Sequence, residues 1–406
     1  MFINRGSGQQ SGTHINCAPA TSGRFKWPYP SKIMTESTES STTSTNGKSS
    51  GKSRINPYIN LMAIFLVPFL YSCASLPKPL TESERVSISQ SGGRADLVNE
   101  MLLSLIPEKT DSVLIFKEDK IVLERYANGY NPGKLHDIRS ATKAITSLLV
   151  GIAIDKGMIA SVDQSILEYF PEQANRHPEF RAIRIRDLLT MSSGLNSDDW
   201  DSKSPGNEEK MYQKKSWVDF FFSLQVIDKP GEHFRYSTAG VIVLGELVKR
   251  ASGIPFDQFA DKYLFQELGI VDYSYARTPA DEIDSGGHLK LNSQDFAKIG
   301  LLVLQKGNWH FTQIVSQAWV QKAIEPAILV TGGHRVGPYM GFLWWQHPVI
   351  KGEVLSFQAR GNGGQYLIAV PGENLLVVFT GSAFNDDKQL LPLSLTEKLV
   401  IPAFRP

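Results

Sequence analysis

A serine followed three residues later by a lysine is the first pattern in this sequence that could do chemistry. It occurs at Ser49, Ser75 and Ser140, so the spacing alone is weak evidence. Only the third copy opens a stretch with helical apolar periodicity, which ends at Gly157. Positions i and i+3 share a helix face, so Ser140 and Lys143 would project side by side, and a lysine with a lowered pKa could activate the serine. The alternative is an N-cap serine followed by a solvated lysine.

A second segment supports a chemical role for Ser140 and Lys143. Residues 230–240, PGEHFRYSTAG, precede a helix that the pattern predicts over 241–252. This segment resembles the serine β-lactamase and penicillin-recognising superfamily, most closely the class C-like branch with esterases and 6-aminohexanoate-dimer hydrolases. In that family a tyrosine lies beside the Ser-x-x-Lys lysine, and Tyr236 matches it. The resemblance implies that Tyr236 relays a proton between Ser140 and the leaving group; the alternative is a half-buried tyrosine before a helix.

Further segments resemble the same superfamily in the same order along the chain. They are 186–195, 292–307 and 341–345, and the resemblance covers about residues 100–390. It implies a β-lactamase fold and an acyl-enzyme formed on Ser140, without a metal or an organic cofactor.

The third family motif differs here. The usual Lys-Thr-Gly is replaced by ARGNGGQ over 359–365, which resembles the version found in the hydrolase branch. By that resemblance, the backbone N–H groups of Ser140 and Asn362 would form the oxyanion hole. Gly361 and Gly363 would let a substrate lie against the strand backbone.

Several side chains near these motifs are candidates for substrate binding. Arg360 could replace a missing carboxylate-binding lysine or could be solvated. Thr238 stands where β-lactamases prefer asparagine. This difference and the loss of Lys-Thr-Gly together argue against efficient penicillin hydrolysis. Asp198, Asp199 and Trp200 lie in a polar segment and could contact a substrate amine, as acidic loop residues do in some relatives. The alternative for that segment is a solvated loop.

The elements that must position these residues follow from periodicity. Alternation over 112–126 predicts a hairpin, and strand-like runs return near the C-terminus at 341–347, 353–359, 365–370 and 374–380. Helical patterns fill the middle, about 140–330, including 241–252 and 293–306, and 388–402 could close with a helix. We therefore expect an α/β (α+β) fold, in which an antiparallel sheet from the N- and C-terminal segments is flanked by helices and contains a helical insertion.

Composition excludes other classes of function. The 42 Lys+Arg against 41 Asp+Glu argue against nucleic acid as a main partner. Two cysteines cannot form a disulfide scaffold or a four-cysteine zinc site, and no His-Glu-x-x-His pattern occurs. We expect neither a metal nor a cofactor.

The first part of the chain differs from the rest. Twelve of the nineteen residues in 35–53 are Ser or Thr, which predicts disorder. The apolar run 59–71 is too short to span a bilayer but has the length of a signal-peptide core. It ends at Leu70-Tyr71-Ser72-Cys73, which resembles a bacterial lipobox and implies a lipidated Cys73. The alternatives are an uncleaved or ordinary signal and a buried apolar segment.

These observations predict three parts: a disordered and signal-like segment over 1–72, a linker over 73–100, and a hydrolase domain over 101–406. We expect an exported serine hydrolase of the cell envelope, held to the membrane by lipid on Cys73 and acting on a small-molecule ester or amide. The alternatives are a D-Ala-D-Ala carboxypeptidase or weak β-lactamase, and a non-catalytic envelope-binding lipoprotein of the same fold.

Overall fold

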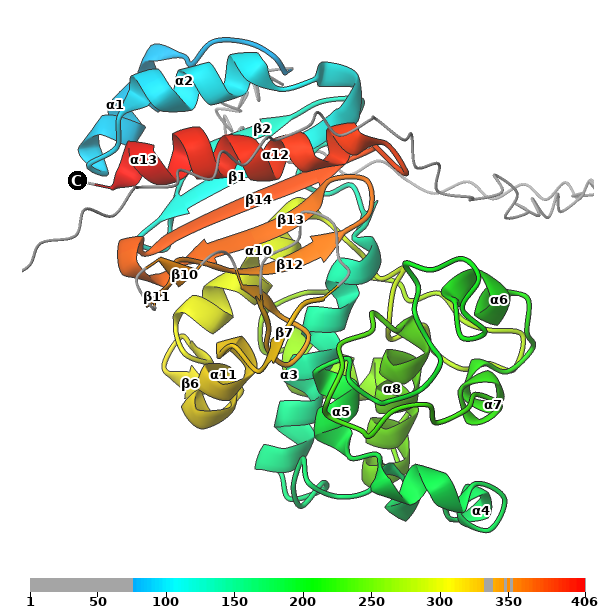
Figure 1. Ribbon diagram of the computed structural model, residues 1–406. Coiled ribbons are helices and arrows are strands. Elements are labelled where there is room, and N and C mark those ends of the chain that lie inside the picture. The colour runs from blue at the N-terminus through cyan, green and yellow to red at the C-terminus, as the bar shows by residue number, and fades with distance from the viewer. Residues whose placement is uncertain (1–75, 332–338, 347–348, 351–352, 406) are drawn as a thin grey trace, which may run out of the picture. The chain divides into compact units, whose positions relative to one another are not determined.

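The computed structural model describes residues 76–331, 339–346, 349–350 and 353–405 (Figure 1). The segment 35–53, the apolar run 59–71 and Cys73 lie outside these residues, so disorder, the signal segment and the lipid anchor stay predictions. Within the described ranges, none of the helices has both the length and the apolar character needed to cross a membrane.

An eight-stranded antiparallel sheet is the central element. Its strands lie side by side in the order β2 (Lys120–Tyr126), β1 (Thr110–Lys117), β14 (Leu375–Gly381), β13 (Gln365–Val370), β12 (Phe357–Gly361), β9 (Trp345–Gln346), β8 (Tyr339–Met340) and β7 (Ile328–Leu329). β1 and β2 are joined by Glu118 and Asp119, whose φ angles are 51° and 62°, as a tight hairpin turn requires. β1 also pairs with β14, so strands from the two ends of the described chain meet at the centre of the sheet. The predicted fold class is confirmed.

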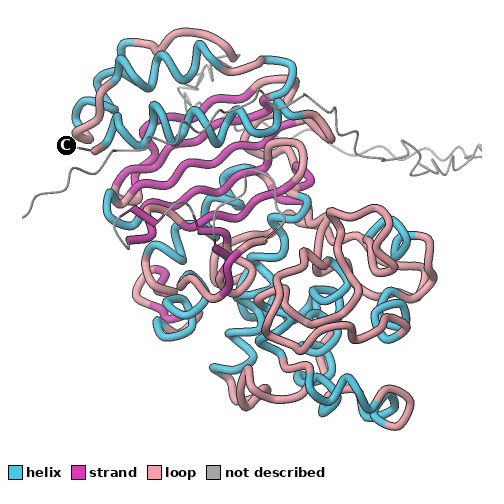
Figure 2. Tube along the Cα trace, viewed as in Figure 1, coloured by secondary structure: helices cyan, strands magenta, loops and turns pink. Residues whose placement is uncertain are grey.

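Helices cover both faces of this sheet (Figures 1 and 2). Side chains alternate along each strand, so Val113 and Ile115 of β1 face one apolar cluster, whereas Leu114 and Phe116 face the other. The first cluster is completed by α1 (Glu82–Gln90), α2 (Ala95–Ser104), α12 (Leu391–Leu395) and α13 (Ile401–Phe404). The second is completed by α3 (Thr142–Asp155), α10 (Ser293–Leu304), α11 (Gln317–Ile324) and the helical insertion.

The insertion between β2 and β7 carries most of the other helices. These are α4 (Pro171–Ala174), α5 (Ile185–Leu189), α6 (Glu208–Tyr212), α7 (Trp217–Phe222), α8 (Thr238–Ser252) and α9 (Phe256–Ala260). Three short strand pairs complete the description: β3 (His136–Asp137) with β4 (Lys290–Leu291), β5 (Asn308–Trp309) with β6 (Thr312–Gln313), and β10 (Val349–Ile350) with β11 (Glu353–Val354).

Capping interactions, which apolar periodicity does not reveal, set the observed ends of α8 and α10. α8 ends where predicted, because Gly253 adopts φ 70° and donates its N–H to the carbonyl of Lys249, but α8 begins at Thr238 rather than at residue 241. α10 begins at Ser293 as predicted and is capped by Asn292, whose side chain accepts from the N–H of Asp295.

The predicted linker over 73–100 differs from the structure in its second half. Residues 82–104 form α1 and α2, whose buried residues Ile88, Val98, Met101 and Leu102 pack against the sheet. The short helix α1 contains only two apolar residues, Val86 and Ile88, and their spacing of two positions does not follow helical periodicity. The folded part of the described chain therefore begins well before residue 101.

The contact between α10 and the sheet depends on Gly300. A Cβ atom on Gly300 would lie 2.6 Å from Cδ1 of Leu376 and 2.9 Å from Cδ2 of Leu367. We expect Gly300→Val to lower the free energy of unfolding by about 1–3 kcal/mol, because larger atoms must displace the sheet. Urea denaturation measures this. The control is Gly372→Ala, where a Cβ meets nothing within 4 Å; an equal loss in both variants would contradict the explanation.

Candidate active site

Ser140 lies in a single 3-10 turn, Arg139–Ala141, directly before α3, and not inside the helix that the pattern predicted. Arg139 has a φ of 51°, an uncommon conformation for a residue with a side chain. The carboxylate of Asp137 holds it there by accepting from the Arg139 N–H at 2.8 Å. The hydroxyl of Thr142 donates to the Arg139 carbonyl at 2.7 Å. These bonds fix the position of the Ser140 side chain, which is half-buried.

The structure brings Ser140, Lys143 and Tyr236 together. Lys143 Nζ donates to Ser140 Oγ at 3.2 Å and lies 5.1 Å from the centroid of the Tyr236 ring. The Tyr236 side chain also forms a hydrogen bond with that of Ser140. Lys143 is 2% exposed and Tyr236 8%. A hydroxyl in contact with both an amine and a phenol can lose and regain a proton without bulk water.

A segment that the sequence patterns did not single out holds Lys143 from the other side. Lys143 Nζ donates to the carbonyl of Gly286 at 2.5 Å. The N–H of Gly286 in turn donates to Oδ1 of the fully buried Asp284 at 3.1 Å. A Cβ on Gly286 would lie 2.7 Å from Cγ2 of Thr238, so the position has no room for a larger residue. The Gly-Gly pair at 286–287, between Asp284 and His288, was the only sequence signal for this anchor.

The charges around Lys143 differ from the sequence-based expectation. Burial by itself lowers the pKa of Lys143, but Tyr236, Glu208, Asp199 and Asp284 outweigh it and raise that pKa above its ordinary value. Burial raises the pKa of Tyr236, although Lys143 opposes the effect. In the free site Lys143 is therefore an ammonium and Tyr236 a neutral phenol, and a base appears only when this pair loses a proton.

The segment after Asn196 is only partly solvated, because residues 201–203 are exposed but Asp199 is not. Asp199 is buried; its Oδ2 accepts from the N–H of Thr238 at 2.6 Å and its Oδ1 accepts from the N–H of Glu208 at 2.9 Å. The fully buried Thr238 donates its hydroxyl to Oε2 of Glu208 at 2.9 Å. Asp198 accepts from the N–H of Trp200 at 2.9 Å. Asp199 and Thr238 are thus engaged inside the protein, and Glu208, which the patterns missed, lies next to them.

Aromatic rings form one wall of the site. The Trp200 ring stacks on Tyr236 at 5.2 Å between centroids and 7° between planes. Trp345, at the start of β9, also stacks with Tyr236, at 5.8 Å and 15°. The sequence patterns placed Trp200 near the site but gave Trp345 no role. The flat stack limits how the tyrosine can rotate, because each ring blocks the other.

The end of β12 borders the turn that carries Ser140. A Cβ on Gly361 would lie 2.3 Å from the carbonyl oxygen of Ile138, so only glycine allows this approach. Gly363 has a φ of 96° and lies against the Phe384 ring. The Asn362 side chain is engaged with Asn385, through a donated hydrogen bond of 2.7 Å and an accepted one of 3.0 Å. The backbone at Asn362 is therefore held firmly beside the Ser140 turn.

Comparison with known proteins identifies the relatives of this arrangement. Residues 106–393, well over half of the 406, match the beta-lactamase family. The chain belongs to this family. The resemblance predicted from the sequence is thereby confirmed.

Individual beta-lactamase relatives are distant. The 6-aminohexanoate-dimer hydrolase of Paenarthrobacter ureafaciens is 25% identical over 230 residues, which cover 53% of this chain and 57% of that protein. The chain spans about half the length of the curated relatives it matches.

Solved structures share the fold. The penicillin binding protein from Bacillus halodurans has a TM-score of 0.58 and 18% identity, covering 75% of this chain and 99% of that chain. EstCE1, a hydrolase with promiscuous acyltransferase activity, has a TM-score of 0.59 and 16% identity, covering 78% of this chain and 98% of that chain.

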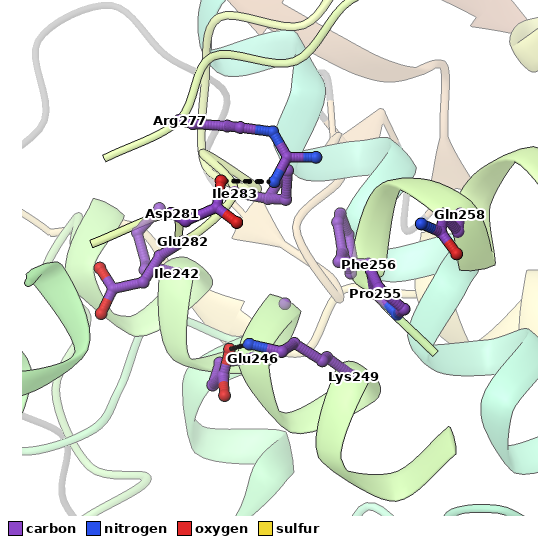
Figure 3. A pocket seen from close by; sticks show the side chains of 11 residues that line it. Ile242, Glu246, Lys249, Pro255, Phe256, Gln258, Arg277, Asp281, Glu282 and Ile283 are labelled. Carbon is purple, nitrogen blue, oxygen red and sulfur yellow. Dashed lines mark hydrogen bonds and ion pairs between the residues drawn. The ribbon is translucent and has the colours of Figure 1, made fainter. Parts of the chain in front are cut away.

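Two further observations on this beta-lactamase-family chain concern metal binding and a pocket away from Ser140. Among the residues that the structure describes, no group of three or more His, Cys, Asp or Glu side chains could hold a metal ion. A pocket of about 410 Å³ is lined by α8, the start of α9 and part of 277–283 (Figure 3), and Ser140 is not among its lining residues. Charged side chains there already pair with one another, as in Lys249–Glu246 at 3.0 Å and Arg277–Asp281 at 2.8 Å.

A second titratable cluster lies beside Ser140. His288 Nδ1 is 2.8 Å from Oδ2 of Asp137, and Arg139 Nη1 is 3.3 Å from the same ring nitrogen. Burial lowers the pKa of His288, but the hydrogen bond to Asp137 and the charges of Asp284 and Asp137 raise it above its ordinary value overall. The pKa of Asp137 is lowered: burial alone would raise it, but the bond to His288 and the charges of His288 and Arg139 prevail.

This cluster predicts a pH-dependent stability. A histidine whose pKa is raised on folding stabilises the protein below its unfolded pKa, and this contribution is lost as the pH rises through the folded pKa. We expect Asp137→Asn to lower Tm most at about pH 5.5 and less at about pH 9. Differential scanning fluorimetry across this range measures the difference. The control is Asp163→Asn. The ionic partners of Asp163 are Arg184 and Arg186, so the loss of Tm in this variant should not become smaller between about pH 5.5 and about pH 9. A constant effect of Asp137→Asn would contradict the pairing with His288.

Proposed function

We propose that this chain is a serine hydrolase that cleaves an ester or amide bond through an acyl-enzyme on Ser140. The observation that carries the proposal is the contact of Ser140 Oγ with both Lys143 Nζ, at 3.2 Å, and the side chain of Tyr236. The similarity to a 6-aminohexanoate-dimer hydrolase, a protein named for hydrolysis, supports the reaction class.

In the proposed reaction, the Lys143–Tyr236 pair accepts and returns each proton. The Lys143–Tyr236 pair, having lost one proton, takes the hydroxyl proton of Ser140 as its Oγ forms a bond to the substrate carbonyl carbon. The negative charge on the carbonyl oxygen is held by the backbone N–H groups of Ser140 and Asn362. The pair then gives its proton to the departing alcohol or amine as the scissile bond breaks. Water next attacks the acyl-enzyme, losing a proton to the pair, which returns it to Ser140.

The Lys143 ammonium has a further part in this scheme. Its bond to the Gly286 carbonyl keeps Nζ in place when its bond to Ser140 Oγ breaks. Asp199, Glu208 and Asp284 raise the pKa of Lys143, so the Lys143–Tyr236 pair releases its proton only at raised pH. The alkaline side of the pH profile therefore belongs to the pair as a whole.

Removing the nucleophile tests the proposal directly. We expect Ser140→Ala to reduce kcat/KM for a nitrophenyl ester by at least about a thousandfold, because no other group can form the acyl-enzyme. The matched control is Ser223→Ala, at an exposed serine directly after α7, which should keep full activity. A fluorophosphonate should transfer its phosphonyl group, with loss of fluoride, to wild type and not to Ser140→Ala, as mass spectrometry would show. Unchanged hydrolysis by the Ser140 variant would refute the assignment.

Asp284 provides a test of the electrostatics. Because Asp284 raises the pKa of Lys143, Asp284→Asn should move the ascending limb of log kcat/KM to lower pH, by up to about one unit. Asparagine keeps an oxygen for the N–H of Gly286, so the geometry is retained. The control is Asp281→Asn, with a side chain 81% exposed, which should leave the limb in place. A shift to higher pH would contradict the proposed charge on Lys143.

A further inference from the structure

Arg360 is a buried cation whose hydrogen-bonding groups are largely unused. It lies on β12 and is 8% exposed. Its Nε donates to Oε1 of Gln358 at 2.7 Å, and Gln358 is held in turn by Ser356, at 2.9 Å. Nη1 and Nη2, in contrast, are buried and have no hydrogen-bond partner among the residues that the structure describes. The sequence-based alternative of a solvated arginine is therefore excluded.

Such an arrangement is unfavourable unless something else binds there. Burial lowers the pKa of Arg360 to about 10, with Tyr366 and Glu397 acting in the opposite direction, so the guanidinium is still charged at neutral pH. A buried charge whose donors lack acceptors keeps its full desolvation cost. Unpaired buried polar groups in a native fold are rare and call for a specific partner.

The surroundings of Arg360 define what that partner can be. Successive strand residues point to opposite faces, and Gly361 faces the Ser140 turn, so Arg360 projects from the other face, beside its cross-strand neighbour Tyr366. The guanidinium carbon lies 5.5 Å from the centroid of the Trp345 ring. That ring also stacks on Tyr236, so one side chain connects Arg360 with the proposed catalytic tyrosine.

We propose that Nη1 and Nη2 of Arg360 bind a small monovalent anion of the size of chloride or a carboxylate group. The planar fork of two free nitrogens matches such an acceptor. One positive charge is available, and the field of the nearby Glu397 carboxylate disfavours phosphate or sulfate with two charges. An anion bound here would also fix the guanidinium against Trp345, and through it the wall of the active site.

Anion-dependent stability tests the site without relying on catalysis. Sodium gluconate, whose anion is much larger, is replaced stepwise by sodium chloride or sodium acetate at constant ionic strength. We expect the Tm of wild type to rise saturably by about 2–4 °C, since only the folded protein binds the anion. Arg360→Gln, which can keep a bond to Gln358, should lose this rise. The control is Arg250→Gln, at a guanidinium already paired with Glu172 and Glu246, which should keep it.

Two results would overturn the proposal. One is an equal chloride and acetate response in wild type and Arg360→Gln. The other applies if Arg360→Gln does not fold: crystals of wild type soaked in bromide should show an anomalous peak within about 3.5 Å of Nη1 or Nη2, and its absence would remove the site. If Glu397 were the only partner that Arg360 needs, neither signal would appear.

The source of the anion is resolved by kinetics, and this arm alone rests on the proposed hydrolase activity. The substrates are nitrophenyl acetate and the nitrophenyl monoester of succinate. If the substrate supplies the carboxylate, chloride raises KM only for the succinate ester, and Arg360→Gln lowers its kcat/KM by about tenfold. If a free anion is the occupant, chloride changes kcat/KM of both esters by the same factor. Failure of both substrates with wild type would refute the hydrolase proposal and leave the stability test intact.

Discussion

A lysine ammonium that is almost fully buried must find acceptors inside the protein, and Lys143 finds them in segments far apart along the chain. One acceptor is Ser140, one turn earlier, and the other is the carbonyl of Gly286. The charges of Asp199, Glu208 and Asp284 favour the ammonium, although burial raises the pKa of Asp199 and of Asp284 themselves. Burial without them would favour a neutral amine. The loop before α6, the loop at 284–288 and the start of α3 are thus held in one arrangement by the need to solvate a single cation.

The same requirement explains why residues around Tyr236 lie so close together. Its carbonyl accepts from the N–H of Asp199 at 2.8 Å, and the next residue, Ser237, shares a hydrogen bond of 2.7 Å with Ser197. The rings of Trp200 and Trp345 then stack with the Tyr236 ring. The tyrosine is therefore fixed by backbone bonds, by ring contacts and by the cation, and no single one of these determines its position.

Much of this could be predicted from sequence, because the decisive patterns are local. Alternation in β1 and β2, helical spacing around Ser140, and Gly253 at the end of α8 depend only on neighbouring residues. The proximity of Ser140, Lys143 and Tyr236 followed from a family resemblance. Gly286 and Trp345 had no local pattern that distinguishes them from loop and core residues, because their importance comes from tertiary contacts. Asp199 was noticed for its charge, yet backbone N–H groups use both its oxygens.

The pairing of β1 with β14 has a consequence for how the protein is made. Thr110 lies opposite Gly381, so the hairpin of β1 and β2 leaves the ribosome long before its central partner exists. During that interval its open edge exposes unpaired backbone groups and an apolar face, the features that lead nascent chains to aggregate. The helical insertion, whose contacts are closer in sequence, can fold first. The order of synthesis therefore leaves one edge of this hairpin unpaired until β14 has been made.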